Sequence, residues 1–533
     1  MNFEFSKSFF SKRHTIFSTK GVVATSQYLA AQTGLEMLKK GGNAVDAAIA
    51  AAACLVVTEP VSNGLGGDAF ALVWSKGKLH GLNSSGPAPM NLHPQKIFGL
   101  SAGTIPAYGW LPVTVPGIPA AWNELSRKFG RLPFNKLLEP AAIYAEEGYP
   151  VSPVVSNSWE KIAAKYKAEL KGPLFKEWFK TFTNNGQPPR AGEIWRSPEM
   201  ACSLRQIGET SAASFYHGEL AERLIDFSRS TGGYLQAADL QQYSPQWVDP
   251  ICTDYKGYTI WELPPNGHGL IVLLALNILK GFDLDSLSEA QVYHTQVEAL
   301  KLAFADALEF VSDPENMQAS VPVLLSNTYA AKRRNLIGST ARDPFPGDPY
   351  SGGTVYLATA DSDGMMVSLI QSNYQGFGSG LVVPGTGISL QNRGCGFNLI
   401  PGHPNCLQPG KRPYHTIIPG FITKGHDPIG PFGVMGAYMQ PQGHLQIISN
   451  LLDKGLNPQA ALDAPRWQWI KNKSLWLEES FPLELSSDLA QSGHEITRSP
   501  DTASFGRGQI IWKNGEVYAA GMESRADSAV ACW

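Results

Sequence analysis

Two alternating runs of residues joined by a short turn constrain the fold of this chain more than any other feature. Residues 354–360 read TVYLATA and residues 365–371 read MMVSLIQ, and both alternate as a β-strand does. The residues between them, DSDG, have the composition of a turn. The pattern therefore predicts a β-hairpin.

The hairpin brings two hydroxyl residues together. Paired positions should sum to about 725, which places Thr354 opposite Gln371 and Ser372 one step away, unless a bulge intervenes. By itself, a threonine that opens a strand is most often only a β-forming residue. Here two glycines precede it, and glycine tolerates strained backbone and leaves the carbonyl of Gly353 open to attack by the Thr354 hydroxyl.

A cut at this position would change the chemistry of Thr354. The residue would then carry a hydroxyl and its own α-amine, whose reference pKa of about 7.7 to 8.0 suits a base near neutral pH. A hydroxyl with an adjacent amine is a nucleophile with its own base. The sequence therefore allows the strategy of an N-terminal nucleophile.

The first seventy residues predict two helices and a strand. Ser26 can cap a helix over residues 27–40, and Asn43 with Asp46 opens a second helix that is apolar on all sides and should be buried. The glycine run at 64–67 lacks the GxGxxG spacing and precedes its strand, so it predicts a close backbone approach and not a dinucleotide site.

Two further helices are predicted in the middle of the chain. Residues 270–279 form an apolar run that is too short for a membrane span and should be a buried helix. Residues 292–315 carry apolar side chains at spacings of three and four, which is typical of an amphipathic helix. His294 on this helix is expected to be a core or surface histidine and not a metal ligand.

Composition excludes several functional classes. The 43 Lys plus Arg are balanced by 46 Asp plus Glu, and no basic arm or tail is present, so nucleic acids and anionic membranes are not expected partners. The N-terminus never builds the uninterrupted apolar core of a secretory signal. We expect a cytoplasmic globular protein.

The cysteines give no metal site. All six are scattered and none forms a CxxC pair, which fits a reducing compartment. Cys395 and Cys406 are close in sequence, but two ordinary thiols are the simpler interpretation. No HExxH, EF-hand or Walker motif occurs, and no cofactor is expected.

Five segments resemble landmarks of the gamma-glutamyltransferase family of N-terminal nucleophile (Ntn) hydrolases, in the same order and along most of the chain. They are GVVATSQYLAAQTGLEMLKKGGNAVDAAIAAA, VTEPVSNGLGGDAF, VTVPGIPAAW, YHTQVEALKLAFADALEFVSDPE and GKRPYHTIIPGF. The resemblance implies an α+β fold, a four-layer αββα sandwich, made as a proenzyme that cuts itself before a catalytic threonine. Residues 1–353 would form the large subunit and residues 354–533 the small subunit of one body. The two subunits would associate, and a homo-oligomer of that pair is left open.

The resemblance also assigns catalytic roles. Thr354 matches the nucleophile, and the bond between Gly353 and Thr354 matches the cleavage site. Ser372 matches the second hydroxyl, a position where relatives commonly have threonine. Gly436 and Ala437 match the pair of backbone amides that forms the oxyanion hole, provided that the φ of Ala437 is allowed.

Three departures from the family pattern bear on the substrate. Asn83 stands where an arginine binds the glutamyl carboxylate, and Gly396 stands before Phe397 where an acid binds the α-amine. His415 and Thr416 replace a pair of serines. A buried site without these partners would desolvate the glutamyl charges at several kcal/mol each, roughly. We therefore expect a different acyl group.

These departures resemble the acylase-like and amidohydrolase branch of the family. Residues 398–410 are also shorter than the lid-bearing stretch of true transferases, which predicts an open site. Oxamate has a carboxylate and an amide but no α-amine, so oxamate hydrolysis to oxalate and ammonia is the leading hypothesis for this small-molecule amide hydrolase. Glutathione hydrolysis, gamma-glutamyl transfer and cephalosporin or glutaryl acylase activity are alternatives. A processed binding protein without activity and a dinucleotide-dependent oxidoreductase are more distant ones.

The contacts to the substrate are left open between function and structure. Arg393 is an attractive partner for a carboxylate because its planar fork matches that group, but it could equally pair with another part of the protein. Tyr374, Tyr414 and His415 are further candidates for the pocket. His268 is expected to be a loop histidine without a chemical role.

Overall fold

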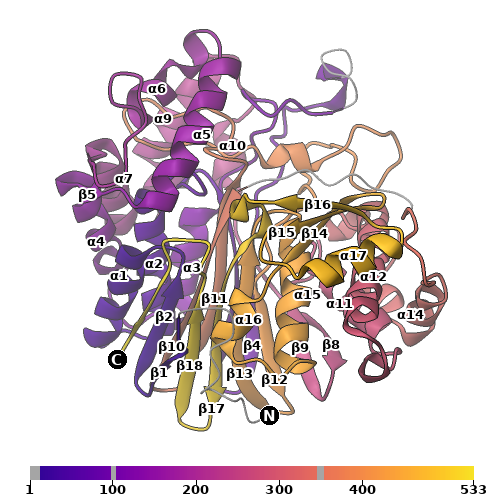
Figure 1. Cartoon of the computed structure of the whole chain (residues 1–533). Coiled ribbons are helices and arrows are strands. Elements are labelled where there is room, and N and C mark those ends of the chain that lie inside the picture. The colour runs from indigo at the N-terminus through magenta and orange to yellow at the C-terminus, as the bar shows by residue number, and fades with distance from the viewer. Residues whose placement is uncertain (1–12, 98–103, 345–352) are drawn as a thin grey trace.

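Two seven-stranded sheets pack against each other at the centre of the molecule, and helices cover their outer faces (Figure 1). The computed structural model describes residues 13–97, 104–344 and 353–533, without the side chains of residues 96, 353 and 354. The layers run helix, sheet, sheet, helix, so the predicted αββα sandwich is confirmed.

Both sheets are antiparallel and combine strands from before and after residue 353. The first sheet has the order β19 (Ala529–Cys532), β2 (Gly21–Thr25), β10 (Gly353–Asp361), β11 (Met366–Tyr374), β3 (Asp68–Ser75), β4 (Lys78–Ser84) and β7 (Gln246–Val248). The second has the order β1 (Ile16–Ser18), β18 (Val517–Met522), β17 (Arg507–Asn514), β13 (Asp427–Met435), β12 (Gly420–Lys424), β9 (Tyr258–Glu262) and β8 (Ile251–Tyr255). Smaller sheets are formed by β14 (Trp467–Lys471), β15 (Ser474–Glu478) and β16 (Glu495–Ser499), and by β5 (Tyr149–Pro150) and β6 (Ile194–Trp195).

The helices divide between the two sides of the sandwich. The first sheet is covered by α1 (Tyr28–Lys39), α2 (Ala44–Thr58) and α3 (Ile118–Phe129). Outside them or beyond the sheet edge lie α4 (Phe134–Glu147), α5 (Pro153–Glu169), α6 (Lys176–Phe182), α7 (Pro198–Glu209), α8 (Ala213–His217), α9 (Glu219–Ser230) and α10 (Ala237–Gln241). The other side holds α11 (Leu270–Leu279), α12 (Glu289–Phe310), α13 (Val321–Leu324), α14 (Asn327–Arg334), α15 (Met439–Leu452), α16 (Pro458–Asp463) and α17 (Leu483–Gln491).

Helices α1 and α2 both begin at a capping residue, but the cap of α1 differs from the predicted one. The side chains of Asn43 and Asp46 form the expected capping box of α2, and every residue of that helix is buried. The cap of α1 is Gln27, whose side chain accepts hydrogen bonds from two backbone N–H groups of the first turn. The prediction that Ser26 caps this helix is wrong, because the Ser26 hydroxyl instead donates to the buried carboxyl of Glu59.

The hairpin is confirmed as β10 and β11, with a register one step from the prediction. Val355, and not Thr354, lies opposite Gln371. The reason is the turn, in which the Asp361 N–H donates to the carbonyl of Met365 and so closes a five-residue loop. The register also shifts between Gly353 and Val355, and Gly353 lies opposite Tyr374.

The remaining expectations about the backbone also agree with the structure. At the glycine run, a Cβ on Gly66 would lie 2.2 Å from the Ser389 carbonyl oxygen and one on Gly67 would lie 2.5 Å from that of Ser372, so the chains do approach closely here. The predicted helices in the middle of the chain are α11, which is fully buried, and α12. Within the described ranges, no helix combines the length and apolarity that crossing a bilayer requires.

Candidate active site

The site forms at one end of three neighbouring strands of the first sheet, β10, β11 and β3. Because Val355 pairs with Gln371 and Gly353 with Tyr374, the backbone of Thr354 lies across from Ser372 and its neighbour Asn373. Ser372 in turn pairs with Asp68, the first residue of β3. The expected meeting of Thr354 and Ser372 is therefore present in the backbone, while the Thr354 side chain lies outside the described atoms.

Ser372 is held in place by its own turn. Its side chain is fully buried, and its Oγ accepts a hydrogen bond of 2.8 Å from the N–H of Tyr374. Tyr374 ends the strand with a φ of 76°, a left-handed conformation that is uncommon outside glycine. This turn directs the chain away from the sheet immediately after the serine.

Gly436 and Ala437 form a tight turn between β13 and α15. Their φ angles are 136° and 50°, so the alanine occupies the left-handed region, which is sterically allowed but uncommon for it. Their carbonyls accept from the N–H groups of Met439 and Gln440 at the start of the helix. Within the described part of the chain, the N–H groups of Gly436 and Ala437 donate to no residue. Two unused amides near a helix N-terminus are suited to stabilising a developing oxyanion.

Arg393 is a fully buried cation with an open edge. Its Nη1 donates to Thr416 Oγ1 at 2.7 Å, and its Cζ lies 4.2 Å from the centroid of the Tyr374 ring. Among the described residues, its Nε and Nη2 have no hydrogen-bond partner. Burial lowers the pKa of the guanidinium to about 10, against the opposing influence of Tyr374 and Asp68. An unused Nε and Nη2 edge is the fork that binds a carboxylate with two parallel hydrogen bonds.

Asp68 and His415 form a buried pair beside this arginine. Asp68 accepts from His415 Nε2 at 3.0 Å, from Gln391 Nε2 at 3.0 Å and from the N–H of Gly86 at 3.1 Å. His415 Nδ1 accepts from the N–H of Ile417, so its proton must lie on Nε2. Burial raises the pKa of Asp68 to about 7 although Arg393 opposes this, and burial holds the pKa of His415 well below its usual range.

An aromatic wall surrounds the arginine. Tyr414 and Tyr438 stack with their ring centroids 6.2 Å apart, and the Tyr374 ring lies 4.2 Å from Arg393 Cζ. The hydroxyl of Tyr414 lies 3.2 Å from His268 Nδ1. The side chains of Tyr374, Tyr414 and His268 are buried and that of Tyr438 is half-buried. His268 lies in the turn before α11, as expected of a loop histidine, and its ring supports this wall.

Two of the residues predicted to contact substrate instead contact other parts of the protein. The Asn83 amide donates to Asn266 Oδ1 at 2.9 Å, and its oxygen accepts from Ser85. At Gly396, a Cβ would lie 2.4 Å from the carbonyl oxygen of Tyr414, so no side chain fits without a backbone shift. Neither position can therefore restore the glutamyl contacts that the sequence lacks.

Three members of the site escaped the sequence analysis. They are Asp68, which accepts from His415, Gln391, which donates to Asp68, and Tyr438, which completes the aromatic wall. Asp68 directly follows a glycine run and opens a strand, which is the one sequence signal that pointed to it. The other two carry no signal in their own neighbourhood.

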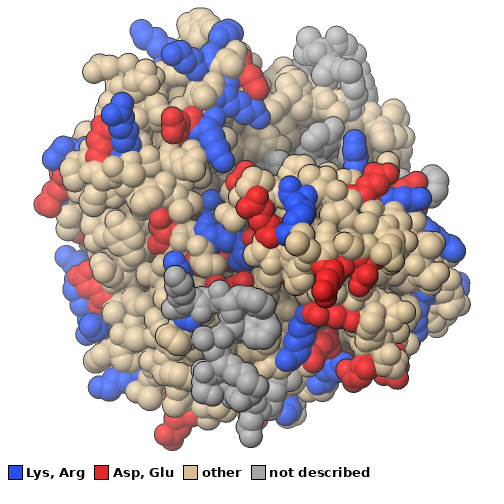
Figure 2. Space-filling view, viewed as in Figure 1, with Lys and Arg blue, Asp and Glu red and all other residues tan. Residues whose placement is uncertain are grey.

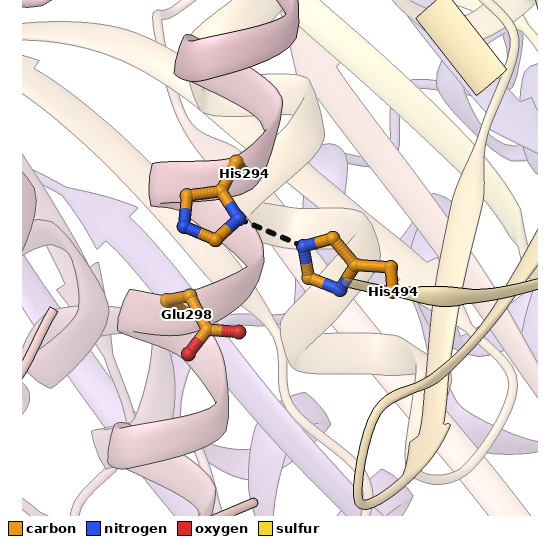
Figure 3. Close-up of side chains that lie close together, drawn as sticks. All are labelled: His294, Glu298 and His494. Atoms are coloured by element: carbon orange, nitrogen blue, oxygen red, sulfur yellow. Dashed lines mark hydrogen bonds between the residues drawn. The ribbon is translucent and has the colours of Figure 1, made fainter. Parts of the chain in front are cut away.

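A second buried cluster lies on the far side of the second sheet, around α12 (Figure 3). His294 Nδ1 lies 2.9 Å from His494 Nε2, and Glu298 is one helical turn further along. These are residue types that can bind a metal, and their donor atoms lie within 4.8 Å of one another. However, His294 Nε2 lies 3.0 Å from the Gly338 carbonyl and Glu298 forms an ion pair of 2.6 Å with Lys301, so protein contacts already occupy these two residues. Among the described residues, His494 Nδ1 has no hydrogen-bond partner.

Comparison with known proteins identifies the family. The family model described as gamma-glutamyltranspeptidase matches residues 30–533. The chain belongs to this family. The predicted recognition is confirmed, and with it a hydrolase that acts on amide bonds and is made as a self-processed proenzyme.

Individual relatives of this gamma-glutamyltranspeptidase family member differ in their activities. The glutathione hydrolase-like YwrD proenzyme of Bacillus subtilis is 37% identical over 497 residues, covering 90% of this chain and 92% of that protein. The oxamate amidohydrolase proenzyme of Klebsiella pneumoniae is 34% identical over 491 residues, with coverages of 90% and 92%. The crystal structure of cephalosporin acylase from Bacillus halodurans has a TM-score of 0.96 at 54% identity, covering 99% of this chain and 98% of that one.

Proposed function

We propose that this protein is a self-processing amidohydrolase whose acyl group carries a carboxylate that binds Arg393. Oxamate, the smallest such amide, is the leading substrate. The observation that carries the proposal is the unused Nε and Nη2 edge of a fully buried guanidinium, three residues before Gly396, where no acid fits. This edge favours an anion, and Gly396 offers no partner for an α-ammonium group.

Processing comes first in the proposed mechanism. The Thr354 hydroxyl attacks the carbonyl of Gly353, and hydrolysis of the resulting ester leaves residues 1–353 and 354–533 as two associated subunits. Thr354 then holds a free α-amine beside its hydroxyl.

Substrate hydrolysis uses the same hydroxyl. The α-amine takes the hydroxyl proton while Oγ attacks the amide carbon, and the N–H groups of Gly436 and Ala437 stabilise the oxyanion. The C–N bond breaks as the amine passes the proton to the leaving nitrogen. Water then attacks the acyl ester, releases the acid and restores the Thr354 hydroxyl. Ser372 supports the α-amine, and no step requires a metal or an organic cofactor.

Cephalosporin acylase activity is the second candidate. It is favoured by the likeness to the Bacillus halodurans acylase, which extends over nearly the whole chain. Glutathione hydrolysis is supported by the name of the YwrD relative, but His415 and Gly396 do not provide the glutamyl contacts. The cytoplasmic location and a homo-oligomer stay predictions, whereas the family assignment argues against a processed binding protein without activity.

The first experiment tests cleavage. Intact mass spectrometry of the purified protein should show two chains that begin at residues 1 and 354, and Thr354→Ala should remain one chain. A single uncut chain that nevertheless hydrolyses amides would contradict the mechanism.

The second experiment tests the acyl group. Ammonia or amine release is measured from oxamate, glutaryl amides and gamma-glutamyl amides at equal concentration. The proposal expects amides with an acyl carboxylate and no α-amine to react fastest. Faster release from gamma-glutamyl amides would favour glutathione hydrolase activity instead.

A further inference from the structure

The buried pair of Asp68 and His415 lies beside Arg393 but has no part in the steps described above. Asp68 accepts from Gln391, which lies two residues before the arginine. His415 directly precedes Thr416, which accepts from Arg393 Nη1. The two members of the pair are therefore tied to the arginine from two separate segments, and a change of charge there reaches both of them.

The charges of these three residues balance above neutral pH. Arg393 bears one positive charge, and Asp68 accepts from three donors, as suits an ionised carboxylate. His415 is neutral, because its Nε2 donates and its Nδ1 accepts a hydrogen bond. Before a substrate binds, the arginine and the pair together carry no net charge.

Burial makes this balance important. Figure 2 shows acidic and basic side chains intermingled on the surface of one face, where water and salt screen such charges. Asp68, Arg393 and His415 are fully buried, so their charges are screened less and an unbalanced charge is unfavourable. A carboxylate bound to Arg393 would add one negative charge to this group without a partner for it.

One proton would restore the balance, and Asp68 is the residue that can accept it. Both nitrogens of His415 are already used, whereas Asp68 Oδ2 accepts only from His415 among the described residues. Burial raises the pKa of Asp68 to about 7, and Arg393 is the main group that opposes this rise. A carboxylate on the arginine weakens that opposition, so the pKa of Asp68 rises further when an anion binds.

The charged and titratable groups that face the pair keep one charge state between pH 7 and pH 9, apart from one amine. They are Arg393 and Arg412, which stay cationic, and His268, Tyr216 and Tyr243, which stay neutral. Burial holds the pKa of His268 well below its usual range and raises those of the two tyrosines above theirs. The exception is the α-amine of cleaved Thr354, with a reference pKa of about 7.7 to 8.0.

We propose that Asp68 takes up one proton from solvent when a carboxylate binds to Arg393, so that the affinity for an anionic acyl group falls as the pH rises. The inference rests on the proposed function for the carboxylate at the arginine, and it adds a proton that must bind with it. The proton returns to solvent when the acid leaves, so none is consumed in a turnover.

Calorimetry of lactate binding to the processed wild-type protein tests the uptake. Lactate is a monoanion close to oxamate in size and contains no amide. Its binding heat is measured at pH 8 in HEPES and in Tris, whose different heats of ionisation reveal the number of protons exchanged. We expect an uptake of about one-half to one proton, and a dissociation constant that rises by up to about tenfold per unit between pH 7 and pH 9. Binding without uptake would overturn the inference.

Asp68→Asn distinguishes this carboxyl from the α-amine of Thr354, which the variant retains. We expect little or no uptake, and tighter lactate binding than in the wild type at pH 9, a gain that damage to the fold would not produce. Unchanged uptake would assign the proton to the amine and overturn the inference. Asp427→Asn, exposed at the far end of β13 from Gly436, is the matched control and should behave as the wild type.

Infrared difference spectra of the wild type provide a test that needs no variant of Asp68. Lactate binding at pH 8 should produce the band of a protonated carboxyl group, which an amine cannot give, and its absence would overturn the inference. Arg393→Met should bind no lactate, and binding that persists there would place the anion elsewhere and overturn the inference too. Lactate that binds nowhere would remove both proposals. Proton-coupled binding without hydrolysis of any amide would leave this inference standing while the proposed function fails.

Discussion

At the scale of single residues, Arg393 combines full burial with unused donors. Leaving buried donors unpaired is unfavourable by about 1–3 kcal/mol, and a buried charge adds to this. A bound carboxylate would offset both the cost of the unpaired donors and the cost of the buried charge. The same residue is thus expected to lower the stability of the free enzyme and to raise its affinity for an anionic acyl group.

Substitution of Arg393 should separate these effects. Arg393→Lys keeps the charge but loses the planar fork, and we expect kcat/KM for the best carboxylate substrate to fall by about 10- to 100-fold. Arg393→Met should abolish measurable turnover while the melting temperature stays equal or rises, because it removes an incompletely paired buried cation. Steady-state kinetics and thermal unfolding of the processed proteins check both. A methionine variant that unfolds at a much lower temperature would show that the arginine is a structural cation instead.

Individual residues also show which features the sequence alone can and cannot predict. The capping box of Asn43 and Asp46 could be predicted, because it depends on neighbours three residues apart. Gly396 could be recognised as a departure, but its cause, the Tyr414 carbonyl 2.4 Å from the missing Cβ, is a contact between separate segments. Asp68 was missed as a site residue for the same reason, since its partner His415 lies 347 residues away in sequence.

At the scale of elements, the turn before α15 holds in one geometry the two backbone N–H groups that we propose for the oxyanion hole, those of Gly436 and Ala437. Ala437 occupies the left-handed region there, which disfavours a residue with a Cβ. The hairpin of β10 and β11 was predictable, because alternation and turn composition are local signals. The predicted register was wrong by one position, because the sequence did not reveal the five-residue loop that Asp361 closes.

Ala437→Gly should be tolerated at this turn. Glycine adopts a φ of 50° without a steric penalty and keeps the backbone N–H, so we expect unchanged or slightly higher stability, by up to about 1 kcal/mol, and at least half of the wild-type kcat. Ala437→Pro removes the N–H and cannot adopt this φ, so it should lose both stability and activity. Kinetics and thermal unfolding distinguish the two variants. Loss of activity in the glycine variant with its fold intact would argue against the oxyanion role.

The pair of His294, on α12, and His494, directly before β16, predicts a pH dependence of stability. Burial, followed by His294 and Lys301, lowers the pKa of His494 to about 3 from 6.5. Between these values the unfolded chain binds a proton that the folded chain does not, so this group makes the protein less stable as the pH falls. The slope is at most about 1.4 kcal/mol per pH unit, and it vanishes above about pH 6.5.

His494→Gln keeps a donor near His294 but does not titrate. The loss of stability between pH 7 and pH 5 should therefore be smaller in this variant than in the wild type, by up to about 2 kcal/mol. Denaturant unfolding at both pH values measures the difference. His426→Gln, at an exposed turn, is the control and should behave as the wild type. Equal pH dependence in all three proteins would contradict the assignment.

At the scale of the whole molecule, the two sides of the Gly353–Thr354 bond are interleaved. In the first sheet β10 and β11 lie between β2 and β3, and in the second sheet β1 pairs with β18 while β12 pairs with β9. The layered fold was predictable from the family resemblance. The order of the strands was not, because pairing between distant segments leaves no local pattern in the sequence.

Refolding experiments should reflect this arrangement. The uncut Thr354→Ala chain is expected to refold from denaturant with a rate and yield that do not depend on protein concentration. The processed protein must bring two chains together, so its recovery should fall as the solution is diluted. Circular dichroism and activity after refolding over a hundredfold range of dilution compare the two. Identical recovery at every dilution would contradict the expectation.

The interleaved sheets give the proposed cut between Gly353 and Thr354 a consequence beyond catalysis. Each subunit lacks strands that both sheets need, so neither holds a complete hydrogen-bonded layer without the other. Cleaving one peptide bond then changes the order of the folding reaction from first to second while the assembled molecule hardly changes. At low protein concentration inside a cell, the mature enzyme would owe its lifetime to slow unfolding, because subunits that separated would rarely meet again.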